Sequence, residues 1–441
     1  MPANGNHDRA GRHLGGSLLL IVAGVFLAFL IAEAAVRLFG LGKPEFYAYS
    51  AARGWKMRAG AQGWQTDEGH AFIRVNRWGY RGPEWSREKP PGTLRVAVLG
   101  DSFVEAQQVP EEITVCAVIE RELTNSLPDF ARGRDKNIKR VEIMNFGVDG
   151  YGTAQEFFTL TRDVWQFSPD IVVLVFFPGN DVRNNSVVLE GDKCRPFFAP
   201  DDGRLVLGGP FEDSPLFRLK CVMRFESYDS QLLNILGEAR SGLRAALRRL
   251  HARDSPAPKA DGRHNETSGV SAREPGVNDL IYRPPTDPTW RQAWQISEGE
   301  IEMIARDSAA HGALFLAVVA DTGAQTQPNP AVQARYLNII GGGDLFYPNH
   351  RIDALGARDG FAVADLVPAM SSYARAHNVY FHGFPNTRLG TGHWNRRGNC
   401  FAGVLIAAKL AAMMASVEPS LNLGSASFDD GQIQRAGARC R

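Results

Sequence analysis

The run Leu94-Arg95-Val96-Ala97-Val98-Leu99-Gly100-Asp101-Ser102 decides the fold that we expect for this chain. Its first six residues are mostly apolar and favour β structure, as in a buried strand of a parallel sheet. A helical stretch follows from about Glu111, so Gly100-Asp101-Ser102 stands at the carboxyl end of a strand. Reacting groups gather at that end of the strands in open α/β sheets. The Ser102 hydroxyl is therefore expected to point into a cleft.

Two further segments repeat this pattern of a strand that runs into a polar loop. Residues 140–147 predict a strand ending in Asn145-Phe146-Gly147, and residues 170–177 predict a stronger one followed by Gly179-Asn180-Asp181. The carboxyl ends of parallel strands share one edge of the sheet, so the glycine and the asparagine are expected beside Ser102. A serine, a glycine amide and an asparagine side chain are the parts of an oxyanion hole.

These blocks, together with His393-Trp394-Asn395, resemble those of the SGNH/GDSL hydrolase family, which is named for Ser, Gly, Asn and His in four blocks. The resemblance runs from about Asn76 to Ala408, and residues 76–82 are similar to the lead-in of membrane-anchored bacterial members. It implies an α/β fold of the flavodoxin-like, three-layer α/β/α kind, with a central parallel sheet of about five strands. The roles that it implies are Ser102 as nucleophile, His393 as general base, and the Ser102 and Gly147 amides with the Asn180 side chain as oxyanion hole.

The histidine block departs from the family pattern. The family places an aspartate two or three residues before the histidine, where this chain has Thr391 and Gly390. That carboxylate fixes the imidazole tautomer and stabilises the imidazolium. A backbone carbonyl, the Thr391 hydroxyl or a carboxylate from elsewhere in the chain must replace it, and the sequence leaves these three open. Supporting roles are expected for two aspartates. Asp101 orients the nucleophile loop or caps the next turn, and Asp181 braces Asn180 or caps the segment after its strand.

The N-terminal region predicts a membrane anchor. Residues 14–32 carry no charge, and the apolar character continues, with two charged interruptions, to residue 41. This length spans a bilayer. Two arginines precede it, so the short tail should stay cytoplasmic. The alternative is a cleaved signal peptide, because Ala32-Glu33-Ala34 fits a small-x-small cleavage pattern. Both interpretations place the catalytic part outside the cytoplasmic membrane, and the resemblance makes that compartment a bacterial periplasm.

Composition restricts the partners. The net charge of +1 and the lack of a basic run argue against nucleic acid. The histidines show no paired ligand spacing and the cysteines form no CxxC, so no metal or other cofactor is expected. The odd number of cysteines, five, leaves at least one thiol free or paired between chains. Cys194 and Cys221 are expected to pair, whereas Cys116 and Cys400 fall in predicted helices and are expected to be buried.

The remaining patterns predict the organisation of the chain. Strands are also expected at 313–320 and 361–365, and helices at 152–167, 290–311 and 397–416, which gives a parallel sheet with helices on both faces. An amphipathic basic helix from Gln231 to Ala252 packs on the core, caps the active site or lies on an anionic membrane surface. The parts that we assign are a cytoplasmic tail (1–13), the anchor (14–41), a short-stranded collar (42–93), the hydrolase domain (94–185 and 290–416), a cap-like insertion (186–289) with a disordered linker (253–278), and a flexible tail (417–441).

Ester hydrolysis is the main functional expectation. Ser102, deprotonated by His393, attacks an acyl carbonyl, and water then releases the acid. The anchor and the aromatic-rich collar, with Trp64, Trp78 and Trp85 among its residues, favour an O-acylated, narrowly an O-acetylated, envelope glycan or a lipid as substrate. One alternative is a periplasmic O-acyltransferase, which needs a multi-span partner because a single span cannot carry the acyl donor across. The other is an inactive glycan-binding protein, which only the missing aspartate supports.

Overall fold

The computed structural model describes residues 7–42, 44–127, 138–227, 230–237, 239–240, 243, 276–415 and 428–440. The chain forms two compact units, one of residues 1–45 and 222–264 and one of residues 46–221 and 265–441. The linker predicted at 253–278 lies, up to residue 275, outside the described residues, and so does most of the basic helix predicted from Gln231. The described start of that helix covers residues 231–237.

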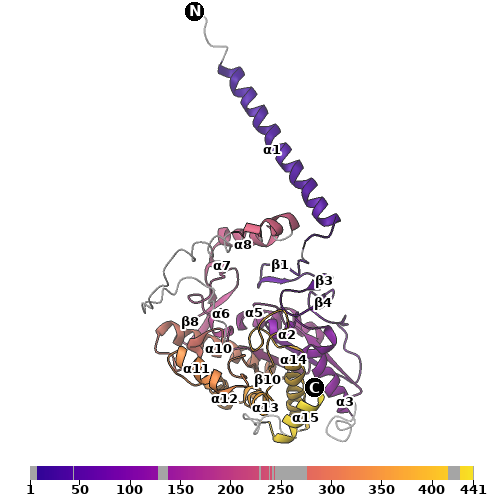
Figure 1. The fold of residues 1–441 in the computed structure, drawn as a ribbon, viewed down its shortest axis with the longest axis vertical. Helices are drawn as coiled ribbons and strands as arrows, with labels where there is room; N and C mark the ends of the chain where they lie inside the picture. Colours follow the sequence, from indigo (N-terminus) through magenta and orange to yellow (C-terminus); the bar gives the residue numbers. More distant parts are fainter. Residues whose placement is uncertain are drawn as a thin grey trace, which may run out of the picture. The chain divides into compact units, whose positions relative to one another are not determined.

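A five-stranded parallel sheet forms the centre of the larger unit (Figure 1). Its order is β11-β10-β7-β5-β6, and every neighbouring pair is parallel. The predicted parallel sheet is confirmed, and each observed strand ends within two residues of its predicted bounds. The strands are β5 (Thr93–Gly100), β6 (Arg140–Asn145), β7 (Ile171–Phe176), β10 (Leu314–Val319) and β11 (Ala362–Asp365).

Helices cover both faces of this sheet. Successive side chains of a strand point to opposite faces. On β5, Val96 and Val98 join a buried cluster with residues of α3 (Val115–Asn125), α13 (Val367–His377) and α14 (Arg396–Ala415). The alternate residues Ala97 and Leu99 are equally buried on the other face. The helices on that face are α5 (Thr153–Thr159), α10 (Pro288–Ala310) and α12 (Tyr347–Asp359).

Two predicted helices differ in their details. The helix expected at 152–167 is regular only as α5, and a π turn (Leu160–Val164) and a 3-10 turn (Trp165–Phe167) complete it. The helix expected from Glu111 begins as a 3-10 turn, and α3 starts after Thr114, whose side chain accepts a hydrogen bond from the Ala117 amide. The shorter helices are α2 (Ser102–Glu105), α6 (Asp181–Asn184), α7 (Pro210–Asp213), α8 (Pro215–Ser227) and α11 (Pro330–Ile339).

Of the flexible tail that we predicted at 417–441, the structure describes residues 428–440. This segment contains α15 (Asp430–Arg439), which starts with a capping box of Asp429 and Gln432. A disulfide joins Cys440 to Cys400 of α14. Cys400 is buried as expected, but its pairing was not predicted. The predicted pair Cys194–Cys221 is confirmed, and Cys116 is a buried free thiol.

The collar consists of two antiparallel hairpins, as the prediction of short strands anticipated. Strands β1 (Tyr47–Ser50) and β2 (Gly54–Met57) form one, and β3 (Gln62–Gln65) and β4 (Ala71–Arg74) form the other. The three tryptophans Trp64, Trp78 and Trp85 of the collar do not share one environment. Trp78 and Trp85 pack against Phe167, whereas Trp64 on β3 is 54% exposed.

One segment of the insertion, residues 197–208, packs on helices of the hydrolase domain. Its hairpin of β8 (Phe197–Asp201) and β9 (Arg204–Gly208) contacts α5 and α10. Phe198 stacks on Phe158 with 5.8 Å between the ring centroids. This hairpin therefore contributes to the helix layer of one face, and the cap-like placement of the whole insertion stays a prediction.

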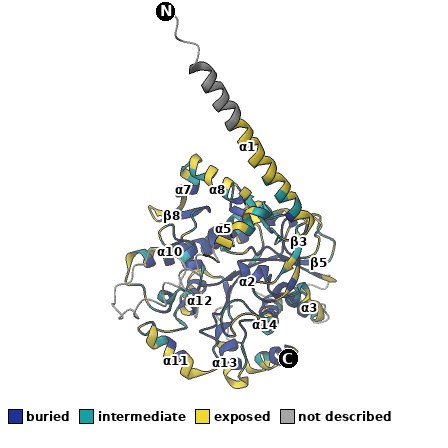
Figure 2. Cartoon of the chain, turned by 45° about the horizontal axis from the view of Figure 1, so that its top comes forward, coloured by how far each residue is buried: buried dark blue, intermediate teal, exposed yellow. Residues whose placement is uncertain are grey.

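The smaller unit contains the predicted N-terminal helix, α1 (His7–Leu38). Its segment Leu19–Leu38 is apolar and long enough to cross a membrane, and its side chains are mostly exposed (Figure 2). Among the described residues, α14 is the other helix of sufficient length and apolarity, and it is largely buried in the core. Near the end of α1, the Glu33 carboxylate accepts hydrogen bonds from the Ser230 hydroxyl (2.8 Å) and from the amides of Gln231 (3.0 Å) and Leu232 (2.9 Å).

Candidate active site

The serine singled out from the sequence lies at the carboxyl end of β5. Ser102 is the first residue of α2 and is 4% exposed. Asp101 precedes it and accepts a hydrogen bond from the Phe103 amide at 2.9 Å, so Asp101 caps this short helix. This contact supports the interpretation of Asp101 as a helix cap. The cap holds the turn that presents the Ser102 hydroxyl.

His393 lies in the loop before α14 and is hydrogen-bonded on both ring nitrogens. Its Nε2 is 2.9 Å from the Ser102 hydroxyl oxygen. Its Nδ1 is hydrogen-bonded to the Glu68 carboxylate, and its backbone amide donates to the other oxygen of that carboxylate at 3.0 Å. Because Nδ1 faces a carboxylate, the proton is on Nδ1 and Nε2 accepts from the serine. The Thr391 hydroxyl instead donates to the Arg388 carbonyl at 2.9 Å, so it does not orient this ring.

Glu68 comes from the collar, between β3 and β4, and the sequence analysis missed it. Two glycines allow the segment that carries Glu68 to pack closely against its neighbours. Gly392 has φ +78°, and a Cβ there would lie 2.1 Å from a Glu68 carboxylate oxygen. Gly69 has φ +71°, and a Cβ there would lie 2.1 Å from the Gln108 carbonyl oxygen. Only glycine combines this backbone conformation with this lack of space.

The contact shifts both pKa values in the direction of an ion pair. Burial raises the pKa of Glu68, but its hydrogen bonds to His393 and the charge of that ring outweigh burial and leave it lowered. Burial lowers the pKa of His393, but the hydrogen bond and charge of Glu68 outweigh it, so this pKa is raised above 6.5. The pair is therefore suited to hold a proton that arrives at the imidazole.

The three expected oxyanion donors differ in whether they already have a hydrogen-bond partner. The Ser102 amide makes no hydrogen bond within the described residues, as a donor reserved for a ligand would. The Gly147 amide donates to the Asn145 side-chain oxygen at 2.9 Å. A Cβ at Gly147 would lie 2.4 Å from the Glu105 amide nitrogen, so glycine is needed there for packing against α2. The Asn180 side chain interacts with Asp101, whose pKa burial raises to about 6 although that interaction lowers it.

The collar also supports the loop that follows the nucleophile. The buried Arg81 donates hydrogen bonds to the backbone carbonyls of Glu105 (3.1 Å), Ala106 and Val109 (2.5 Å). Glu105 is fully buried and accepts from the Tyr47 hydroxyl at 2.8 Å. Three carbonyls on one guanidinium fix the path of residues 105–109, and with it the position of α2.

A second buried histidine clamps the loop of His393. His382 is hydrogen-bonded through Nδ1 to the Gly392 carbonyl at 2.7 Å and through Nε2 to Asp321 at 2.8 Å. The other oxygen of Asp321 accepts from the Trp394 indole at 2.6 Å. Both neighbours of His393 are therefore tied to Asp321. Since a carbonyl and a carboxylate are acceptors, both ring nitrogens of His382 carry protons. Burial lowers its pKa, but the charge of Asp321 outweighs burial and raises it.

Four buried carboxyl groups lie behind the nucleophile and Asn180. They are Asp101, Glu156, Asp181 and Glu300. The charge of Asp101 raises the pKa values of Glu156 and Asp181, and the charge of Glu156 raises those of Asp181 and Glu300. Burial is the largest cause in each, and it raises the pKa values of the last three well above the ordinary range. Asp181 accepts from the Phe177 amide at 2.7 Å, which fixes the turn into α6 rather than Asn180 itself. Neither oxygen of Glu156 or Glu300 has a hydrogen-bond partner among the described residues, so these groups are protonated.

Comparison with known proteins finds a likeness to solved structures only. No family model and no curated protein matches the chain. Solved structures do match, among them an acetyl xylan esterase, AlAXEase (12% identity, TM-score 0.35, covering 71% of this chain and 98% of that one). Another is a lipase/acylhydrolase from Enterococcus faecalis (13%, 0.33, 74% and 98%). A third is a GDSL-like lipase from Bacteroides thetaiotaomicron (11%, 0.26, 73% and 87%). The structural neighbours are GDSL-type acylhydrolases and esterases. At these identities and TM-scores, the function must be argued from the site itself.

Proposed function

We propose that this chain is a serine ester hydrolase of the SGNH/GDSL type. The observation that carries the proposal is the hydrogen-bond chain from Glu68 through His393 to Ser102. A nucleophile within reach of a base, which a third group orients in turn, is the arrangement that covalent acyl transfer needs. The missing aspartate was the sole support for an inactive binding protein, and Glu68 takes the position in which that aspartate acts.

The geometry suggests the following steps. The Ser102 hydroxyl attacks the acyl carbonyl while its proton passes to Nε2 of His393, and Glu68 stabilises the imidazolium. The free Ser102 amide and the Asn180 side chain bind the oxyanion, and the Gly147 amide joins them once it leaves Asn145. The imidazolium then protonates the leaving alcohol. Water, deprotonated by His393, attacks the acyl-enzyme and releases the acid and the free serine.

The same proposal places the enzyme on the outer side of a membrane. Two disulfides favour an oxidising compartment. The helix Leu19–Leu38 then acts as a retained anchor, because Glu33 binds the start of the helix at residues 231–237. Signal cleavage after Ala34 would remove that carboxylate. The intact mass of the mature protein tests this point, and a mass lacking residues 1–34 would contradict it.

The experiment for the reaction is hydrolysis of p-nitrophenyl acetate by the detergent-solubilised protein. We expect turnover that Ser102→Ala and His393→Ala each lower by at least about 10³-fold, with the fold retained. Ser126→Ala is a suitable control, since this serine lies at the end of α3, away from the proposed triad. Equal turnover by the wild type and by the Ser102→Ala variant would sink the proposal.

A further inference from the structure

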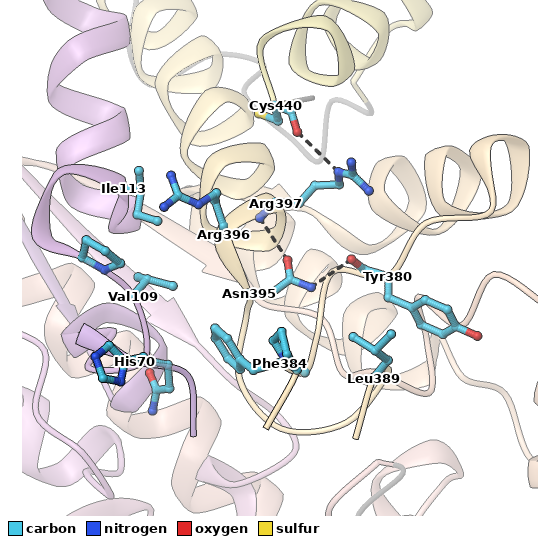
Figure 3. Close-up of a pocket in the computed structure, with 14 residues that line it drawn as sticks. His70, Val109, Ile113, Tyr380, Phe384, Leu389, Asn395, Arg396, Arg397 and Cys440 are labelled. Carbon is cyan, nitrogen blue, oxygen red and sulfur yellow. Dashed lines mark hydrogen bonds between the residues drawn. The ribbon is translucent and has the colours of Figure 1, made fainter. Parts of the chain in front are cut away.

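A cavity of about 450 Å³, whose lining Figure 3 shows, includes residues that stand close in the chain to two of the proposed catalytic residues. His70 follows Glu68 by two residues and Asn395 follows His393 by two, and both line the cavity. Two residues span at most about 7 Å. A polymer that occupies this cavity therefore lies within one or two sugar units of the triad.

Aromatic rings lead from the surface into the cavity. The His70 ring lies on Trp64 with 4.6 Å between the centroids, and Phe72 meets Trp64 edge to face at 5.4 Å. Trp64 is 54% exposed and Phe72 is 37% exposed. We call Trp64, His70 and Phe72 the aromatic face, and Phe384 continues it inside the cavity. Exposed rings of this kind offer flat surfaces on which the C–H faces of sugar rings stack.

The charge of the cavity is positive. Two arginines, Arg396 and Arg397, belong to its lining, and none of the lining residues is acidic. Arg397 donates through Nε to the Cys440 carbonyl at 3.3 Å, and Arg396 extends toward Ile113 (Figure 3). Within the described residues neither guanidinium has an ion-pair partner, whereas the exposed Arg358 is paired with Asp359. A guanidinium without an acid beside it is suited to a carboxylate of a ligand, which it binds through two parallel hydrogen bonds.

We propose that the cavity and the aromatic face bind an acidic polysaccharide, with a uronate carboxylate on Arg396 and sugar rings on Trp64 and Phe384. The inference rests on the proposed function for the reaction, and it names the class of substrate as an O-acylated polyuronate. A neutral glycan would bring no charge to pair with the arginines, and a lipid chain would meet the polar groups of His70, Gln108 and Asn395 as well as the arginines.

The test is equilibrium binding by the detergent-solubilised full chain, with hexagalacturonate as the acidic probe and xylohexaose as the neutral one. We expect hexagalacturonate to bind at least about tenfold more tightly, and Arg396→Gln to weaken that binding by roughly tenfold. Trp64→Ala should weaken binding of the same probe. Arg335→Gln is the matched control, because Arg335 is an exposed arginine of α11 outside the cavity and is expected to leave binding unchanged.

Three results would overturn the inference. They are equal affinity for the two oligosaccharides, equal effects of Arg396→Gln and Arg335→Gln, and binding of anionic phospholipid vesicles, but not of hexagalacturonate, through Arg396. Turnover of p-nitrophenyl acetate is measured on the same wild-type preparation. Turnover without hexagalacturonate binding contradicts this inference alone, whereas binding without turnover contradicts only the proposed hydrolase.

Discussion

Glu68 holds His393 by two hydrogen bonds, one to the imidazole Nδ1 and one to the backbone amide at 3.0 Å. One carboxylate thus fixes both the tautomer of the ring and the path of the chain that carries it. An aspartate two or three residues before the histidine would act from the same loop. Here the carboxylate comes from a separate hairpin, so the orientation of the base depends on how the collar packs.

The first prediction concerns this carboxylate. Glu68→Gln keeps the size of the side chain but removes its charge, so the imidazolium is no longer stabilised and the other tautomer becomes accessible. We expect kcat for p-nitrophenyl acetate to fall by about 10³–10⁴-fold. The acid limb of the pH profile of kcat/KM should also move to lower pH, because Glu68 raises the pKa of His393. Gln65→Glu, on the same hairpin, is the control, and wild-type kinetics of Glu68→Gln would refute the role.

The second prediction concerns Gly392. Gly392→Ala places a Cβ against the Glu68 carboxylate in a left-handed backbone conformation. We expect a loss of stability of about 1 kcal/mol together with a fall in kcat of at least tenfold. Gly360→Ala is a matched control, because Gly360 has φ +76° with no atom within 4 Å of the added Cβ. It should lose similar stability by thermal unfolding and keep its activity. Equal activity of the two variants would contradict a specific role for Gly392.

The third prediction concerns the clamp on the loop of His393. His382→Gln cannot donate to both the Gly392 carbonyl and Asp321 from the same positions. We expect kcat to fall by about tenfold with little change in KM, since His382 positions the base and does not touch the substrate. Thr326→Val is the control, because it removes another donor to Asp321 (2.7 Å) without altering the loop. A higher KM with unchanged kcat would argue against the clamp.

The fourth prediction concerns stability and pH. Burial raises the pKa values of Glu156, Asp181 and Glu300 well above their unfolded values, so the folded state binds more protons than the unfolded state. Stability must therefore fall as the pH rises above about 4.5 toward those pKa values. We expect Glu300→Gln to flatten this fall and to raise stability at pH 8 by more than about 1 kcal/mol.

Urea unfolding at pH 5 and pH 8 provides the measurement for this cluster. Glu88→Gln is the control, because Glu88 is an exposed carboxyl. It should leave the difference between the two pH values unchanged. A Glu300→Gln variant that unfolds more easily at pH 8 than the wild type would show that the cluster is not protonated as we infer.

The fifth prediction concerns the disulfide between α14 and α15. It links residues 40 positions apart, and removing such a link costs about 2–4 kcal/mol. The double variant Cys400→Ala/Cys440→Ala should unfold at lower temperature and lose α15 first to limited proteolysis. Cys116→Ala, which alters the buried free thiol, removes no cross-link and should leave α15 protected. Equal protection of α15 in both variants would show that the packing of α15 against α13, and not the disulfide, holds this helix.

The strand pattern and the order of the motifs predicted much of this molecule, because buried parallel strands are local apolar runs and the loops after them share one edge. Ser102 and His393 could be predicted as site residues for that reason. The Ser102 Oγ and the His393 Nε2 lie 2.9 Å apart. The Cys194–Cys221 pair was also accessible from the two positions that flank one stretch of the insertion.

Only the tertiary structure decided which residues surround Ser102 and His393. Glu68 is 325 residues before His393, and no local pattern marks it, because its role depends on a hairpin, on two glycines and on the loop against which it packs. The same holds for Arg81, Asp321 and the Cys400–Cys440 pair, whose partners are distant in the chain. Local sequence determined which elements form and where the nucleophile stands. Long-range packing determined which carboxylate faces the base and which arginines meet the neighbouring cavity.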